Sequence, residues 1–298
     1  MSLADLARQG LVTKDHPLAG MSTYKFGGPA AWYAEAETVD QLAAALAASD
    51  VPFVVLGRGS NVVISDRGYH GLVVKLTGEF NEVAMGEETV EAGAGVSLPR
   101  LARTCAAANR GGLEFYVGIP GSVGGAVVMN AGGHGSDTAE WLATAGVLDT
   151  ATGRITSSTP EELELSYRHS RLTRADVVLR ARFRTVQRDR DECEALMREI
   201  TSWRREHQPG GTFNAGSVFK NPPDDSAGRL IDVCGLKGFA VRGASVSERH
   251  ANFFVADDTA TAQDVYDLVS EVRGLVLART GVLLEPEIRF IGDFGNES

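Results

Sequence analysis

The sequence is poor in several features that identify whole classes of proteins. Only three of its 298 residues are cysteine, and their odd number and wide spacing form no metal-ligand motif, so we expect no metal site. Cys105 and Cys193 lie in helical patterns and are interpreted as small buried residues. No apolar run reaches 18 residues, and the N-terminus has no basic segment followed by an apolar one. We therefore expect a soluble, cytoplasmic protein without a membrane partner.

Positive charge is also scarce. The chain has 39 acidic residues against 29 Lys and Arg, which gives a formal net charge of −10. Nucleic-acid binding needs a basic face, and nothing here supplies one. Small anionic ligands remain possible because they need only a few local Arg or Lys residues. The apolar content of 43% is that of a globular protein, and the length predicts two or three domains.

Glycine, in contrast, is concentrated in two segments. Residues 118–133, GIPGSVGGAVVMNAGG, are too apolar for a linker, and we expect them to be too irregular for a helix. Residues 57–66, GRGSNVVISD, follow the apolar run 52–56. Glycine allows the backbone to approach a ligand closely, and a row of main-chain N–H groups forms an anion site. Two such segments predict a ligand with two phosphates, and hence a dinucleotide.

The glycine pattern does not match the common nucleotide folds. A Rossmann fingerprint needs a third glycine and a helix, but Val62 occupies the third position, and Val62, Val63 and Ile64 favour a strand. The Gly-Lys-Ser/Thr of a P-loop does not occur. We therefore expect the turn backbone between strands to hold phosphate without a helix dipole. A tight turn that binds no ligand is the alternative for this segment.

Hydrophobic periodicity predicts the main elements. Thr38 begins the first helix with a capping box, and a turn-rich break at 207–216 marks a domain boundary. The expected helices are 39–48, 97–109, 188–206 and 261–279, and the expected strands are 52–56, 72–76, 145–148, 155–157, 177–185 and 283–290.

The order of strand, GxGSN turn, strand and GIPGSVGGA segment resembles the flavin domain of vanillyl-alcohol-oxidase-like flavoproteins. This resemblance implies an α+β fold, with a two-lobed FAD-binding domain of the PCMH type in 1–76 and 77–192 and a C-terminal α+β substrate-binding domain in 200–298. Neither glycine segment contains His or Cys, so we expect FAD to be bound non-covalently. The expected cofactor-binding residues are Gly57, Arg58, Gly59, Ser60, Asn61, Gly118, Pro120, Gly121, Ser122, Gly124, Gly125 and Ala126.

Three later segments could carry chemistry: 166–170, 214–222 and 283–292. Strand alternation places Ser217 and Asn221 on one face of the second segment, and Glu285, Glu287 and Arg289 on one face of the third. Taken alone, these residues indicate only polar groups that line a cleft, or ordinary surface pairs.

A closer resemblance comes from motifs that follow one another over residues 23–292: TYKFGG, GRGSNVVISD, GIPGSVGGAVVMNAGG, YRHS, NAGSVFKNP, AGRLIDVCGLKG, HANFFV and EPEIRFIG. Together they are similar to the UDP-N-acetylenolpyruvoylglucosamine reductase family, whose members are also called UDP-N-acetylmuramate dehydrogenases. This resemblance implies a flavoenzyme of peptidoglycan precursor synthesis. NADPH reduces its FAD, and the flavin then passes hydride to the enolpyruvyl ether of the nucleotide sugar.

The resemblance also implies roles for individual residues. Ser217 corresponds to the proton donor, and Arg168 and Glu287 to the groups that stabilise the substrate carboxylate as negative charge builds up. For the nucleotide sugar it points to Asn221, Lys220, Arg289 and Tyr167, with Lys237 as another phosphate partner.

One departure limits the comparison. Only about fifty residues separate Tyr167 from Ser217, as in short members that lack a tyrosine-bearing insertion, so contacts made by that insertion do not transfer. We expect a monomer. Two alternatives stay open: an FAD-dependent oxidase or dehydrogenase of a hydroxy acid or sugar, and a non-catalytic module that binds a nucleotide sugar.

Overall fold

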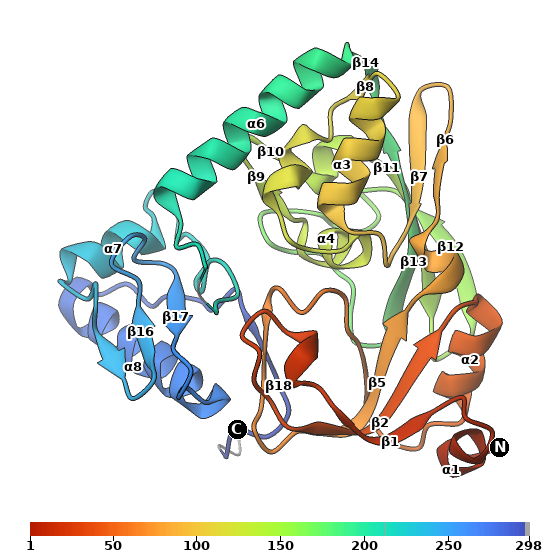
Figure 1. Cartoon of the computed structure of the whole chain (residues 1–298), viewed down its shortest axis with the longest axis horizontal. Coiled ribbons are helices and arrows are strands. Elements are labelled where there is room, and N and C mark those ends of the chain that lie inside the picture. The colour runs from red at the N-terminus through yellow and green to blue at the C-terminus, as the bar shows by residue number, and fades with distance from the viewer. Residues whose placement is uncertain (212, 296–298) are drawn as a thin grey trace. The chain divides into compact units, whose positions relative to one another are not determined.

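The computed structural model describes residues 1–211 and 213–295 (Figure 1). The chain forms two compact units. The first contains Met1–Lys14, Trp32–Arg58 and Gly71–Arg204, and the second contains Asp15–Ala31, Gly59–His70 and Arg205–Ser298. The second unit thus combines the C-terminal part of the chain with two N-terminal segments. The domain borders expected near residues 76, 192 and 200 stay a prediction.

The first unit is built around a five-stranded antiparallel sheet with the order β12-β11-β13-β7-β6. Its central strand alternates as predicted: Leu179, Ala181 and Phe183 are buried, whereas the intervening arginines are exposed. Two of these arginines pair with Glu91 on the neighbouring strand. The strands are β6 (Val83–Met85), β7 (Thr89–Gly93), β11 (Leu142–Asp149), β12 (Arg154–Ser158) and β13 (Asp176–Arg184).

A second sheet has the order β1-β2-β5-β3, in which β3 and β5 are parallel. The first amphipathic helix begins where predicted, because the Thr38 side chain accepts a hydrogen bond from the Gln41 N–H at 3.2 Å. The elements are β1 (Thr13–Pro17), β2 (Pro29–Ala36), β3 (Phe53–Val55), β5 (Tyr69–Leu76), α1 (Leu3–Arg8) and α2 (Val39–Ala47).

The second glycine-rich segment contains a helix, so the expectation that 118–133 is irregular was wrong. Helix α4 (Val123–Met129) begins at Ser122, whose side chain accepts a hydrogen bond from the Gly125 N–H at 3.4 Å. Val123, Ala126 and Val127 are buried in the core, and this burial outweighs the low helix propensity of glycine.

The other elements of the first unit include two longer helices. Helix α6 confirms the amphipathic helix predicted at 188–206, and α3 confirms the one predicted after Ser97. The bounds are α3 (Leu98–Ala107), α5 (Thr138–Trp141), α6 (Arg190–His207), β8 (Arg110–Gly111), β9 (Gly132–Gly133), β10 (Ser136–Asp137), β14 (Val186–Gln187), η2 (Gly78–Asn81) and η3 (Glu114–Gly118).

The second unit packs two helices against short strands. The strand expected over 283–290 is regular only at Arg289–Ile291 (β18), where it runs parallel to Val62–Ile64 (β4). The preceding residues are extended but make single bridges instead of a ladder. The other elements are α7 (Ala227–Val233), α8 (Ala262–Thr280), β15 (Ala240–Val241), β16 (Ala244–Val246), β17 (Phe254–Ala256) and η1 (Ala19–Met21).

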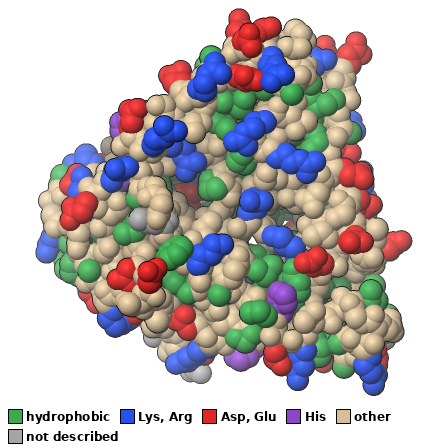
Figure 2. Space-filling model, viewed as in Figure 1, with side chains coloured by type: hydrophobic (Ala, Val, Ile, Leu, Met, Phe, Trp, Pro, Cys, Tyr) green, Lys and Arg blue, Asp and Glu red, His purple; other side chains and the backbone are tan. Residues whose placement is uncertain are grey.

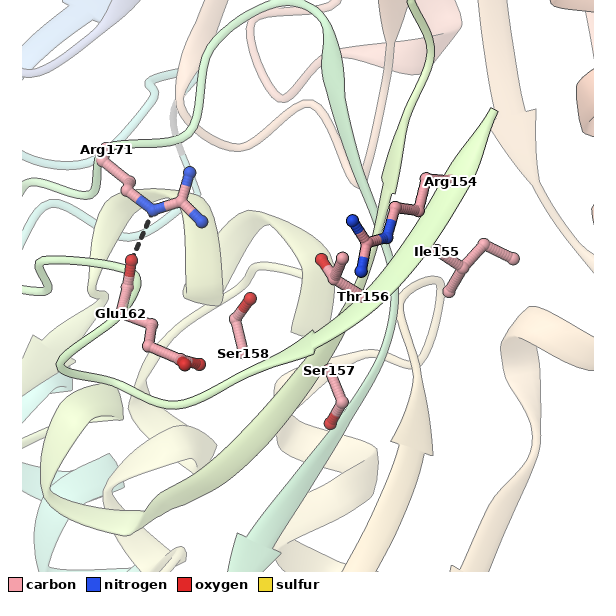
Figure 3. Close-up of a pocket in the computed structure, with 7 residues that line it drawn as sticks. All are labelled: Arg154, Ile155, Thr156, Ser157, Ser158, Glu162 and Arg171. Carbon is pink, nitrogen blue, oxygen red and sulfur yellow. Dashed lines mark hydrogen bonds between the residues drawn. The ribbon is translucent and has the colours of Figure 1, made fainter. Parts of the chain in front are cut away.

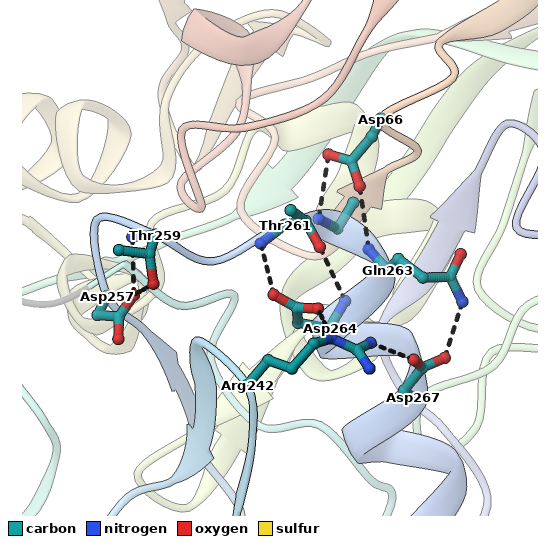
Figure 4. A network of polar contacts seen from close by, with 9 residues as sticks. Asp66, Arg242, Asp257, Thr259, Thr261, Gln263, Asp264 and Asp267 are labelled. Carbon is teal, nitrogen blue, oxygen red and sulfur yellow. Dashed lines mark hydrogen bonds and ion pairs between the residues drawn. The ribbon is translucent and has the colours of Figure 1, made fainter.

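The start of α8 is fixed by acidic side chains (Figure 4). Thr261 and Asp264 form a reciprocal capping box. The Asp66 carboxylate, which follows β4, accepts hydrogen bonds from the N–H groups of Ala262 and Gln263, each at 3.1 Å. The last residue of the GRGSNVVISD motif therefore anchors the longest helix of its unit. Among the described residues, no helix is long and apolar enough to cross a membrane.

Candidate active site

In the first unit, the two predicted cofactor segments meet at Gly57 and Ser122. A Cβ at Gly57 would lie 2.5 Å from the Ser122 hydroxyl oxygen, so a larger residue there would force the Ser122 side chain to move. The Lys75 ammonium on β5 donates a hydrogen bond to the Gly57 carbonyl oxygen. Burial, and then the charge of Arg58, lower the pKa of Lys75. The first glycine segment is therefore held at its start by a partly desolvated cation.

In the second unit, Gly59 is fixed by the protein backbone. Its φ is +64°, and a Cβ there would lie 2.0 Å from the Met21 carbonyl oxygen. The Thr23 N–H donates to the Gly59 carbonyl oxygen at 3.0 Å. The close neighbours of Gly57 and Gly59 are thus protein atoms, so chain packing requires glycine at 59 and leaves little room for a side chain at 57, independently of any ligand.

The main-chain N–H groups of residues 57–61 can hold an anion. In the part of the chain that the structure describes, none of them donates a hydrogen bond to a protein acceptor. A run of free N–H groups in a turn is the donor set that a phosphate requires. The role of this segment in binding the diphosphate of a dinucleotide stays a prediction.

In the second glycine segment, main-chain groups form hydrogen bonds to other parts of the protein. Gly121 accepts a hydrogen bond from the Leu98 N–H at 3.0 Å, and the Gly124 N–H donates to the Ala94 carbonyl oxygen at 2.9 Å. The predicted role of Gly124 therefore does not rest on its N–H group. Gly118 lies beside Ile200 of α6.

In Figure 2, Lys and Arg side chains are frequent over the part of the first unit that contains α3, α4 and α6, although the net charge is negative.

Arg168 sits in a tight hairpin of the first unit. Ser166 and His169 exchange two main-chain hydrogen bonds of 3.1 Å, and Arg168 between them has a φ of +54°. The guanidinium donates to the carbonyl oxygens of Asn130 at 3.4 Å and Gly132 at 2.8 Å. Its centre lies 5.1 Å from the centroid of the Tyr167 ring. The left-handed backbone and the two carbonyl groups together fix the direction of the side chain.

Asn130 supports this hairpin and was not predicted as a site residue. It ends α4 in a left-handed conformation and is 1% exposed. Its side-chain N–H group donates to the Ser166 carbonyl oxygen at 3.0 Å, and its Oδ1 accepts from the Ala139 N–H at 2.8 Å. The only sequence signal was its place in the MNAGG end of the second glycine segment.

In the second unit, the structure brings Ser217 and Glu287 onto neighbouring extended segments. The Glu287 N–H donates to the carbonyl oxygen of Val218 at 2.7 Å, next to Ser217. Ser217 forms a bridge with Phe253 on its other side. The amide of the buried Asn252 binds both the N–H and the C=O of Phe219, at 2.9 and 2.8 Å. The Ser217 segment is therefore held from two sides.

The predicted substrate-binding residues are distributed over both units. Lys220 pairs with Glu285 at 2.6 Å, and Lys237 pairs with Asp232 at 2.9 Å. The Asn221 side chain accepts a hydrogen bond from the Ala227 N–H at 3.1 Å. Arg289 is exposed in the second unit, and Tyr167 is exposed in the first. Roles in substrate binding stay predictions for all of them.

An open hollow of about 650 Å³ lies on the first unit at the edge strand β12 (Figure 3). It contains none of the predicted site residues. Its wall is polar, and Arg171 is tied to the main chain of Glu162. The lining residues are Arg154, Ile155, Thr156, Ser157, Ser158, Glu162 and Arg171.

Comparison with known proteins places the chain in a class that agrees with these features. Residues 30–159 match the FAD binding domain family, so the chain is a flavoprotein with an FAD-binding domain. Residues 208–291 match the family described as UDP-N-acetylenolpyruvoylglucosamine reductase, C-terminal domain.

Full-length relatives agree. The reductase of that name from Agathobacter rectalis is 41% identical and covers 97% of this chain and 96% of its own. Reductase 2 from Symbiobacterium thermophilum is 43% identical, and the alignment covers 95% of this chain and 93% of that protein. The crystal structure of the Thermus caldophilus enzyme superimposes with a TM-score of 0.81 at 38% identity, covering 92% of this chain and 97% of that one. The chain belongs to the UDP-N-acetylenolpyruvoylglucosamine reductase family.

Family membership confirms several expectations. The α+β fold class, with an FAD-binding domain and a C-terminal reductase domain, was predicted correctly, as was FAD. The roles of individual site residues stay predictions.

Proposed function

We propose that this chain reduces the enolpyruvyl ether of UDP-N-acetylglucosamine-enolpyruvate to UDP-N-acetylmuramate, a peptidoglycan precursor, with NADPH as reductant. Similarity of about 40% over nearly the full length to reductases of this name is the observation that carries the proposal. The pairing of the Ser217 and Glu287 segments supports it, because the chemistry needs a proton donor and a second polar group on the substrate carboxylate.

The residues of the first glycine segment would hold the diphosphate of non-covalently bound FAD. The free N–H groups of 57–61 are suited to this role, and Lys75 fixes the first carbonyl of the segment. The FAD that these residues would hold would supply redox chemistry, in which hydride from NADPH is passed on to the methylene carbon of the enolpyruvyl group. Protein side chains would bind the substrate carboxylate and supply the proton.

Arg168 would bind the substrate carboxylate. When hydride reaches the methylene carbon, negative charge builds up on the neighbouring carbon and spreads into the carboxylate. A planar guanidinium can make two parallel hydrogen bonds to that group and stabilise the charge. The carbonyl groups of Asn130 and Gly132 hold the guanidinium in one orientation, so little reorganisation is needed during the reaction.

Ser217 would protonate the carbon, and a protonated Glu287 would donate a hydrogen bond to the carboxylate. General acid catalysis of this kind contributes about 10²–10⁴-fold to a rate. Asn221, Lys220, Arg289, Tyr167 and Lys237 would contact the nucleotide sugar, and Lys220 would then leave its pairing with Glu285. We further propose that the enzyme acts in the cytoplasm as a monomer.

Substitution of Ser217 tests this assignment. In Ser217→Ala, rapid mixing with NADPH should bleach the flavin at nearly the wild-type rate, because that step needs no proton from Ser217. Mixing the reduced enzyme with the enolpyruvyl substrate should then restore the flavin colour at least about 100-fold more slowly. Ser245→Ala, on a strand remote in sequence from the motif, is the matched control. Equal loss of both steps in Ser217→Ala would show that the residue is structural.

A further inference from the structure

Asn61 is directly bonded to the segment that carries Glu287. Its side-chain N–H group donates to the Glu287 carbonyl oxygen at 3.1 Å, and its own carbonyl oxygen accepts from the Arg289 N–H at 3.0 Å. Both bonds lie within the second unit. The side-chain bond joins positions 226 residues apart in the sequence, at the point where β4 and β18 begin to run side by side.

The two peptide groups that flank Glu287 are therefore both fixed. Its N–H donates to Val218, and its C=O accepts from Asn61. Because the direction of a side chain from the backbone depends on these two peptides, the pair of bonds limits where the Glu287 carboxyl group can lie. The first of them also joins Glu287 to the segment of Ser217.

We propose that Asn61 is a positioning residue for Glu287, so that the end of the glycine turn and the carboxyl group are held in one arrangement. This inference rests on the role proposed above for Glu287 in the reduction of the substrate. The sequence interpretation places Asn61 among the cofactor-binding residues. Its main-chain N–H remains available for that purpose, but its side-chain amide serves the Glu287 segment.

The proposal has a distinct kinetic consequence. Removal of the amide should affect the step in which Glu287 acts and spare the step in which it does not. Misplacement of a reacting group by about 1 Å can cost roughly 10²-fold in rate. Hydride transfer from NADPH to the flavin needs no carboxyl group at this position, so it provides an internal reference in the same protein.

The test compares Asn61→Ala, Asn61→Asp and Glu287→Gln with the two double variants, all saturated with FAD. Flavin bleaching by NADPH and colour recovery with the enolpyruvyl substrate are measured separately by rapid mixing. We expect Asn61→Ala and Asn61→Asp to slow recovery by about 10–100-fold and to change bleaching by less than about threefold. In the Glu287→Gln background, either Asn61 substitution should change recovery by less than about twofold, because the group it positions is already lost.

Asn109→Asp is the matched control. It introduces the same charge at another asparagine that is bonded to main chain, where Oδ1 accepts from the Arg190 N–H at 3.0 Å, and should change neither step. If the losses in Asn61 and Glu287 multiply fully in the double variants, Asn61 does not act through Glu287 and the inference is wrong. Normal recovery in the Asn61 variants, with only weaker FAD binding, would also overturn it. Normal recovery in Glu287→Gln would instead show that the proposed function assigns Glu287 wrongly.

Discussion

Arg168 donates a hydrogen bond of 2.8 Å from its terminal guanidinium nitrogen to the carbonyl oxygen of Gly132. The acceptor lies 36 residues earlier in the chain, near the end of the second glycine-rich segment. This bond and the one to the Asn130 carbonyl oxygen hold the guanidinium in one orientation. Arg168 is thus part of a preformed arrangement within the first unit.

Arg168→Lys should therefore be poorly tolerated. An ammonium keeps the charge but cannot bind two carbonyl groups and a carboxylate in one plane. We expect the recovery step with the enolpyruvyl substrate to slow by about 10²-fold or more, while NADPH still reduces the flavin. Arg171→Lys, in the neighbouring turn, is the control. Near-normal turnover of Arg168→Lys would count against the carboxylate role.

Lys75→Met should weaken cofactor binding. The Lys75 ammonium holds the Gly57 carbonyl oxygen, and hydrogen bonds to charged groups contribute about 1.5–3 kcal/mol. Loss of this bond frees the start of the glycine turn, so we expect the dissociation constant of FAD to rise by about tenfold or more. Titration of the apoenzyme by flavin fluorescence measures it. The exposed Lys14→Met is the control, and unchanged FAD affinity in Lys75→Met would contradict the role.

Glu114 should stabilise the first unit in a pH-dependent way. Burial alone would raise its pKa, but hydrogen bonds from its own backbone, Cys193, Arg188 and Gly112 outweigh this and lower the pKa below the usual 4.5. The ionised carboxylate is therefore preferred in the folded state. Its contribution to stability is complete well above pH 4.5 and is lost as the pH falls through the lower pKa of the folded protein.

Glu114→Gln should accordingly lower the free energy of unfolding at pH 7 by about 1–3 kcal/mol. The difference from the wild type should shrink as the pH falls below about 4.5. Urea unfolding at several pH values measures it. Glu194→Gln, whose partner Arg190 is exposed, should cost less than about 1 kcal/mol. A penalty for Glu114→Gln that does not change with pH would argue for a packing effect.

The sequence predicted the elements whose pattern is local. Helices α2 and α8 carry capping threonines before amphipathic runs, and β13 alternates buried and exposed residues, so each could be identified from neighbouring positions. Helix α4 was missed because its glycine and valine residues disfavour a helix. Burial against the core determines its structure, and such contacts are not visible in a short stretch of sequence.

In the candidate site, too, local motifs could be recognised in the sequence, whereas contacts between distant residues could not. Motif resemblance predicts Ser217, Glu287 and Arg168 as site residues, and these roles stay predictions, whereas the sequence did not indicate which asparagines hold the segments that carry them. Asn61, Asn130 and Asn252 each bind main-chain groups between 33 and 226 residues away, and such partners can be recognised only in three dimensions. The available signal was that each asparagine belongs to one of the shared motifs.

The most direct test of the account follows the flavin absorbance of the purified protein through two additions without oxygen. NADPH should bleach the yellow colour, and UDP-N-acetylglucosamine-enolpyruvate should restore it with one UDP-N-acetylmuramate formed for each NADPH consumed. A protein that stays bleached until oxygen is admitted, or that NADPH does not bleach at all, would contradict the proposed reaction.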